Sequence, residues 1–232
     1  MRIALDIRQL RVGPSGDRSH LLGLLEHFPA LAPQDEFLLC LDQPLPPEAP
    51  TLPAAANVHV RVLPSRPGWL WTPVVWPRQL RRERVQVAHG VYLVPPFAPC
   101  PTVVTIHDVS FMAHPEWFPR RALRRMRVLI PLAARRATRI VTGSAHAAGE
   151  IVRYLRVPRE KIVVIPDAAS PDLAPLDRAE AAAQVGARFG LQQYAEGRAD
   201  LAAALATGKA DAALTENLKT NIALADRYLA HQ

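Results

Sequence analysis

The sequence predicts an α/β fold, a Rossmann-like, doubly wound domain built on a mainly parallel sheet. Two observations support this prediction: short and nearly continuous apolar runs recur up to residue 165, and helical patterns separate them. Strands that are buried on both faces read as unbroken apolar runs, and the helices between them cover the two faces of a parallel sheet. A chain of 232 residues that is 49% hydrophobic is also long enough to bury such a core.

The expected elements follow one another in a regular order. We expect strands at residues 2–7, 37–41, 58–63, 86–89, 102–106, 139–142 and 161–165, and helices at about 21–28, 119–136 and 145–155. Ligands of such sheets bind beyond the carboxyl ends of the strands. We therefore expect the strands that end at Asp6, Ile106 and Thr142 to lie side by side, and the loops after them to form one binding rim.

The pattern changes after Pro166, where strand-like runs stop and the sequence becomes Ala-rich and helical. We expect a Rossmann-like domain over residues 1–170, a connecting segment over 171–191 and a helical tail over 192–232. Within the tail, residues 211–229 carry apolar side chains on one helical face. This stripe predicts docking on a hydrophobic surface, so that the tail either covers the exposed cleft or mediates assembly with a partner chain or a second copy.

The composition excludes several classes of protein. The formal net charge is +7, and only three of the 28 basic residues are lysines. This arginine bias fits either a GC-rich genome or an anionic partner such as a phosphate-bearing substrate or a lipid headgroup. Nucleic acid is not an expected partner, because the sequence carries no nucleic-acid-binding motif. Two distant cysteines and the lack of a long apolar run favour a cytoplasmic protein without a membrane span.

Several motifs occur in a fixed order along the chain. They are TIHDV at residues 105–109, ATRIVTGS at 137–144 and VPREKIVVIP at 157–166. Together with the opening strand and residues 176–191, these motifs resemble the amino-terminal domain of family 4 glycosyltransferases. The resemblance covers roughly residues 1–191.

The resemblance implies half of a GT-B fold, in which two Rossmann-like domains face each other across a cleft. The first domain mainly holds the acceptor, and the second mainly holds the nucleotide sugar. Residues 192–232 are too few for a second Rossmann domain. We therefore expect a truncated glycosyltransferase that is weak or inactive alone, or alternatively a non-catalytic module that binds an acceptor or a partner.

The resemblance also implies the chemistry of the site. We expect sugar transfer from a nucleotide sugar without a metal ion to a sugar acceptor, which is lipid-linked in one alternative. No metal-ligand cluster and no Asp-x-Asp element stand out in the sequence. We therefore expect no metal site.

Two adjacent residues are the candidates for catalysis. His107 directly follows a predicted strand, so its imidazole should face the cleft, where it can hydrogen-bond to an acceptor hydroxyl or a developing charge. Asp108 could orient that imidazole or bind a sugar hydroxyl. It could equally cap the turn that follows.

Five further residues are candidates for substrate binding, and each has a structural alternative. Gly13 and Gly16 could let the backbone approach a phosphate, or could serve a plain turn, and the neighbouring Asp17 would repel an anion. His89 and Gly90 could approach a ligand or pack in the core. Ser144 could contact a ligand or cap the next helix.

Tryptophans and arginines gather in one stretch, residues 67–84, and a second arginine group lies at 120–127. Tryptophans beside arginines could rest on a membrane interface, as in peripheral enzymes that glycosylate lipid-linked acceptors. The alternative is a solvated basic face with the tryptophans packed in the core.

Overall fold

The computed structural model describes residues 1–13 and 15–167. These residues belong to one compact unit, Met1–Ala168. The predicted connecting segment and helical tail lie outside the described residues.

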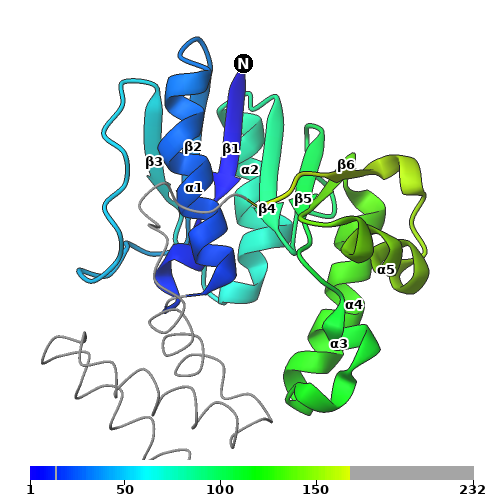
Figure 1. Cartoon of the computed structure of the whole chain (residues 1–232). Coiled ribbons are helices and arrows are strands. Elements are labelled where there is room, and N and C mark those ends of the chain that lie inside the picture. The colour runs from blue at the N-terminus through cyan, green and yellow to red at the C-terminus, as the bar shows by residue number, and fades with distance from the viewer. Residues whose placement is uncertain (14, 168–232) are drawn as a thin grey trace, which may run out of the picture. The chain divides into compact units, whose positions relative to one another are not determined.

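The described chain forms a seven-stranded sheet in which every neighbouring pair is parallel, as the sequence predicts. The strands are β1 (Arg2–Asp6), β2 (Glu36–Leu41), β3 (Val58–Val62), β4 (Val87–Val91), β5 (Thr102–Thr105), β6 (Arg139–Thr142) and β7 (Ile162–Val164). Their order in the sheet is β3-β2-β1-β4-β5-β6-β7 (Figure 1). Thus β5 and β6 are neighbours, as expected, whereas β4 separates β1 from β5.

The helices connect these strands. They are α1 (Gly16–Leu31), α2 (Trp76–Arg82), α3 (Ser110–Ala113), α4 (Arg120–Arg136) and α5 (Ala145–Leu155). Shorter helical turns are η1 (Arg8–Arg11), η2 (Gly68–Leu70), η3 (Trp71–Val75), η4 (Pro115–Trp117) and η5 (Arg159–Lys161). The sequence predicted α1, α4 and α5 but not α2, because the prolines at 73 and 77 disguise its start.

Alternating strand residues build a core on each face of the sheet. Leu5 and Leu39 pack with Leu21 and Leu25 of α1. Ala4, Leu38 and their neighbours pack on the opposite face, against residues of η3 and α2. Successive strand side chains point to opposite faces, so unbroken apolar runs are what a sheet covered on both sides requires.

The tryptophans divide between the core and the surface. Trp71 and Trp76 are fully buried and stack with their ring centroids 5.1 Å apart. Trp69 and Trp117 are 70% and 67% exposed. The core interpretation therefore holds for the first two, whereas the last two remain available to a partner surface.

Strand β4 extends beyond its predicted end at His89. It continues to Val91 and pairs with β1 on one side and β5 on the other. His89 and Gly90 therefore lie inside a central strand and not after it. The sequence hid this because Gly90 interrupts the apolar run.

Among the described residues, no helix is both long enough and apolar enough to span a membrane.

Candidate functional site

The loop after β5 holds His107 at the carboxyl edge of the sheet. Ile106 N–H donates to the carbonyl of Val141 at 2.9 Å, which continues the β5–β6 ladder by one residue. The hydroxyl of Thr142 lies 3.5 Å from the carbonyl oxygen of His107. The main chain of His107 is thus fixed by β6, and its side chain points towards α1.

Helix α1 places two polar side chains against His107. Oδ1 of Asp17 lies 3.6 Å from Nε2 of His107, which is longer than a hydrogen bond. The ring of His20 meets the ring of His107 edge to face, with centroids 4.8 Å apart. Asp17 and His20 are three residues apart and so share one face of the helix.

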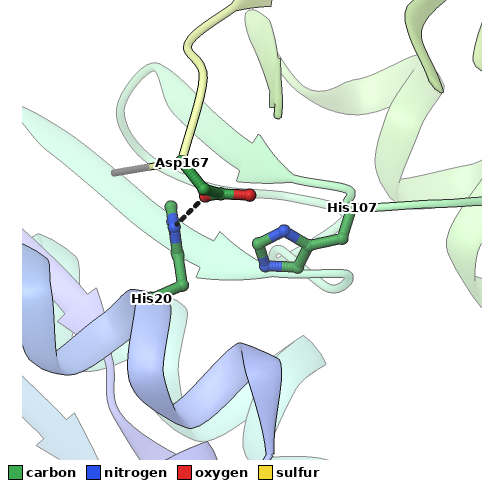
Figure 2. Close-up of side chains that lie close together, drawn as sticks. All are labelled: His20, His107 and Asp167. Atoms are coloured by element: carbon green, nitrogen blue, oxygen red, sulfur yellow. Dashed lines mark ion pairs between the residues drawn. The ribbon is translucent and has the colours of Figure 1, made fainter. Parts of the chain in front are cut away.

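The segment after β7 adds a carboxylate to the same place. Ile165 N–H donates to the carbonyl of Thr142 at 2.9 Å, which extends the pairing of β7 beyond its last strand residue. Two residues later, Oδ1 of Asp167 lies 3.3 Å from Nδ1 of His20 (Figure 2). Three segments that are far apart in the sequence therefore bring His20, His107 and Asp167 together at one edge.

Gly143 makes room for the Asp167 carboxylate. A Cβ at position 143 would lie 2.6 Å from Oδ2 of Asp167, closer than real Cβ contacts. Because glycine has no side chain, the carboxylate can pack directly on its backbone. An alanine at position 143 would therefore require the exposed Asp167 side chain to move.

Burial sets the electrostatics of this cluster. Burial raises the pKa of Asp17, and the nearby His107 partly opposes this rise. Burial lowers the pKa of His20, and His107 lowers it further. Burial thus disfavours the charged form of both groups. Nε2 of His20 and Nε2 of His107 are buried atoms without a hydrogen-bond partner among the described residues. Buried polar atoms are normally paired, so these two nitrogens are able to bond to a ligand, although the indole nitrogens of Trp71 and Trp76 in the core likewise have no partner in the described part of the chain.

His89 lies beneath the cluster and is held by the core. Its Nε2 is 2.8 Å from the hydroxyl of Thr105 in β5. Burial is the main cause that lowers the pKa of His89 to about 4, with smaller contributions from His20 and His107. A neutral imidazole bonded to Thr105 fits the core-packing interpretation of this residue.

Gly90, next to His89, also has a packing explanation. A Cβ there would lie 2.2 Å from the carbonyl oxygen of Leu93, so only glycine fits beneath the turn that ends β4. Its contact with a ligand remains a prediction.

Asp108 makes its hydrogen bonds with Ser110 and Tyr92. Its Oδ1 accepts hydrogen bonds from the backbone N–H of Ser110, at 2.8 Å, and from the Ser110 hydroxyl. Its Oδ2 accepts a long one, 3.4 Å, from the hydroxyl of Tyr92. These contacts match the turn-capping alternative. The carboxylate that faces the His107 imidazole belongs to Asp17.

The remaining predicted residues lie at helix starts. Ser144 accepts a hydrogen bond from Ala147 N–H at 3.1 Å and so caps α5. Gly13 and Gly16 are exposed, and a Cβ at either would meet no atom within 4 Å. Binding of a ligand by these three residues remains a prediction.

Sequence reasoning missed His20, Asp167 and the role of Asp17. Asp167 follows the last strand, so the rule that located His107 would have found it if extended to β7. Asp17 and His20 carried no such signal, since they lie on a helix and not directly after a strand. Only the docking of α1 against the β5 loop brings them to the site.

The fold and the site define a class of protein: a Rossmann-like α/β domain with a polar cluster at the edge where such domains bind ligands. A profile of Glycosyltransferase Family 4 matches residues 17–173, which include the whole cluster. The chain therefore belongs to glycosyltransferase family 4.

One curated relative is an O-antigen chain mannosyltransferase B from Escherichia coli, which is 31% identical over 101 residues. The match covers 44% of this chain and 26% of the relative. The chain thus spans about a quarter of the length of that relative.

Proposed function

We propose that the described unit is the acceptor-side domain of a glycosyltransferase that moves a sugar from a nucleotide-sugar donor onto a carbohydrate acceptor. The observation that carries this proposal is the position of His107, whose buried Nε2 has no hydrogen-bond partner among the described residues and faces Asp17 of α1. Family membership supports the reaction class, and this geometry supports an acceptor contact at His107.

His107 can act on an acceptor hydroxyl in this position. An imidazole nitrogen can hydrogen-bond to the hydroxyl or take up its proton, and a nearby carboxylate stabilises the cationic form. Asp17 Oδ1 lies 3.6 Å from this same Nε2, so an acceptor hydroxyl seated beside the nitrogen could bond to the imidazole and to the carboxylate. Asp17, and not Asp108, is therefore the carboxylate that we propose to act beside the reactive nitrogen.

The donor diphosphate belongs elsewhere. Asp17 and Asp167 both lie beside His107, and two carboxylates would repel a pyrophosphate. Cationic groups and helix dipoles of a second, donor-binding domain would stabilise the leaving group, so no metal ion is needed for the transfer. We expect the described unit by itself to transfer sugar weakly.

The outward face of α4 supports a lipid-linked acceptor and peripheral contact with the inner face of the membrane. Arg121, Arg124, Arg125 and Arg135 are exposed on this helix, and Val128 is 65% exposed between them. The helix carries no acidic residue. Exposed apolar side chains flanked by arginines are suited to an anionic lipid surface.

The test is a transfer assay with the full chain, a panel of nucleotide sugars and mixed saccharide acceptors. The name of the relative makes a nucleotide-activated mannose the first donor to try. The proposal is supported if the parent chain turns over, His107→Ala abolishes turnover and His146→Ala does not. His146 is a suitable control because its side chain is 86% exposed on α5. Turnover that is indifferent to His107 would refute the proposed role of that residue. Saccharide binding without turnover for any donor would favour the non-catalytic module.

A further inference from the structure

His20, His107 and Asp167 form a group that is able to hold a metal ion. One ligand atom from each residue can be chosen so that all three lie within 4.8 Å of one another (Figure 2). We propose that these residues bind a divalent transition-metal ion of the Zn²⁺ type. Two imidazoles and one carboxylate are a common ligand set for such ions, with a fourth position left to water or substrate.

One pair of ligand atoms already has the separation that the ion needs, and the set as a whole, within 4.8 Å, has to close further. Tetrahedral zinc with bonds of about 2.0–2.2 Å places its ligand atoms roughly 3.4 Å apart. Nδ1 of His20 and Oδ1 of Asp167 are already 3.3 Å apart. The Asp167 side chain is 62% exposed and can move, and a change of side-chain torsion in His20 or His107 would close the remaining distance.

The local charge favours a cation although the whole chain is basic. The formal net charge is +7, yet the charged groups that act on Asp17 and His20 are imidazoles and the carboxylates of Asp108 and Asp167. The nearest arginine in sequence, Arg18, donates instead to the carbonyl of Val12 at 3.2 Å. Asp17, beside His107, supplies a further carboxylate next to the open position.

The alternative is that the His20–Asp167 contact merely ties the segment after β7 to α1. That contact accounts for one nitrogen of His20 and for no nitrogen of His107. It leaves both buried Nε2 atoms without a partner among the described residues. An ion held by Nδ1 of His20 and Oδ1 of Asp167 would also engage the His107 ring, which the His20–Asp167 contact does not involve.

An ion at this place would exclude the acceptor from His107. Metal binding is therefore an inhibited state of the site and not a requirement of sugar transfer. It can be tested without any assay of transfer.

The experiment titrates the metal-free full chain with Co²⁺, followed by visible absorption, and with Zn²⁺, followed by calorimetry. We expect one ion per chain and absorption bands of a four-coordinate site with nitrogen ligands. His20→Ala and Asp167→Asn should each weaken binding at least tenfold. Gly143→Ala should weaken it as well, because the added Cβ displaces the Asp167 carboxylate.

The matched control is His146→Ala, because His146 and Glu150 form an exposed histidine–carboxylate pair at 3.7 Å on α5. This variant should bind as the parent does, and circular dichroism should show all four variants folded. The proposal is overturned if the parent binds no ion, or if folded His20→Ala and Asp167→Asn bind it as tightly as the parent. Either result leaves the sugar-transfer proposal untouched, since that rests on His107 and its acceptor.

Discussion

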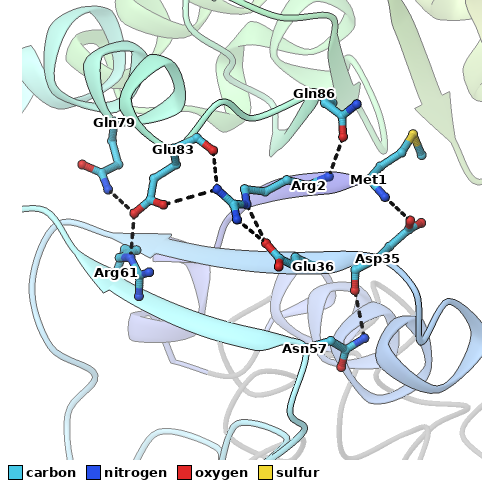
Figure 3. Close-up of polar contacts among 9 residues, drawn as sticks. All are labelled: Met1, Arg2, Asp35, Glu36, Asn57, Arg61, Gln79, Glu83 and Gln86. Atoms are coloured by element: carbon cyan, nitrogen blue, oxygen red, sulfur yellow. Dashed lines mark hydrogen bonds and ion pairs between the residues drawn. The ribbon is translucent and has the colours of Figure 1, made fainter.

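Two polar networks of this molecule differ in how fully their groups are paired. One begins at the amino ends of β1 and β2, where the Arg2 guanidinium bonds to Glu36 and to the main-chain carbonyl of Glu83. The Glu83 carboxylate in turn accepts from Arg61 and Gln79, each at 3.0 Å (Figure 3). The other network is the cluster around His107 at the carboxyl edge, which leaves two buried nitrogens without a partner among the described residues.

We interpret the Arg2–Glu83 network as structural and the His107 cluster as a ligand site. Paired groups rigidify the fold, whereas an unpaired buried group costs stability and persists where a ligand satisfies it. Substitutions in the Arg2–Glu83 network should therefore change stability, and substitutions in the His107 cluster should change binding and turnover.

The largest effect is expected at His107. His107→Ala should lower the transfer rate by about a hundredfold or more, because it removes the group that contacts the acceptor hydroxyl. The free energy of unfolding should change by less than about 1 kcal/mol, since the lost nitrogen has no partner. Chemical denaturation and a rate measurement on the same preparation check both parts. A large loss of stability would place His107 among the structural residues.

Glu83 should behave in the opposite way. Glu83→Ala removes the acceptor of Arg61 and Gln79, and it should lower the free energy of unfolding by about 1–2 kcal/mol while acceptor binding is retained. Glu48→Ala is the control, because Glu48 is also acidic but exposed. Equal denaturation midpoints for the two variants would contradict a structural role of the Arg2–Glu83 network.

The pH dependence of stability tests whether His89 belongs to the core. Burial lowers its pKa from the ordinary 6.5 to about 4, so protonation favours the unfolded chain. The contribution of His89 to stability is full above pH 6.5 and is lost as the pH falls towards 4. The variant His89→Gln should show a shallower decline of unfolding free energy over this range. An unchanged slope would mean that His89 is accessible to protons in the folded state.

The smallest effect is expected on α4. Val128→Asp should reduce binding to vesicles that contain anionic lipid by several-fold, because it places a charge among the exposed arginines and removes an apolar contact. Folding should be unaffected, since Val128 is 65% exposed. Vesicle sedimentation measures the change, and Ala122→Ser, an exposed and neutral replacement on the same helix, is the control. Equal sedimentation of both variants would contradict the proposed contact of α4 with an anionic membrane.

Local patterns predicted most of the fold. The β-branched run at Thr102–Thr105 and the apolar run at Glu36–Leu41 became strands close to where they were expected. Strand β4 was less visible, because Gly90 interrupts its pattern and only the packing against Leu93 requires that glycine. Helix α2 was hidden by Pro73 and Pro77, residues that usually oppose helices but are accommodated here at its start.

The site was predicted only in part, for a physical reason. His107 could be found because it follows a strand, and the carboxyl edge of a parallel sheet is a ligand edge. Its partners Asp17 and His20 lie on a helix, and their proximity depends on the docking of α1, which leaves no mark in the local sequence. Asp108 was a candidate because it follows His107 in the sequence, yet it accepts a hydrogen bond from the Ser110 N–H in the turn that follows.

The central claim is that the carboxyl edge around His107 binds the acceptor saccharide. The most direct measurement is a titration of the metal-free chain, with isotope-labelled histidines, against a mannose-containing oligosaccharide. Nuclear magnetic resonance of the histidine rings follows the titration. The account predicts that the signals of His20 and His107 shift together along one saturation curve, while that of the exposed His146 stays in place. A saccharide that binds without moving His20 or His107 would contradict it.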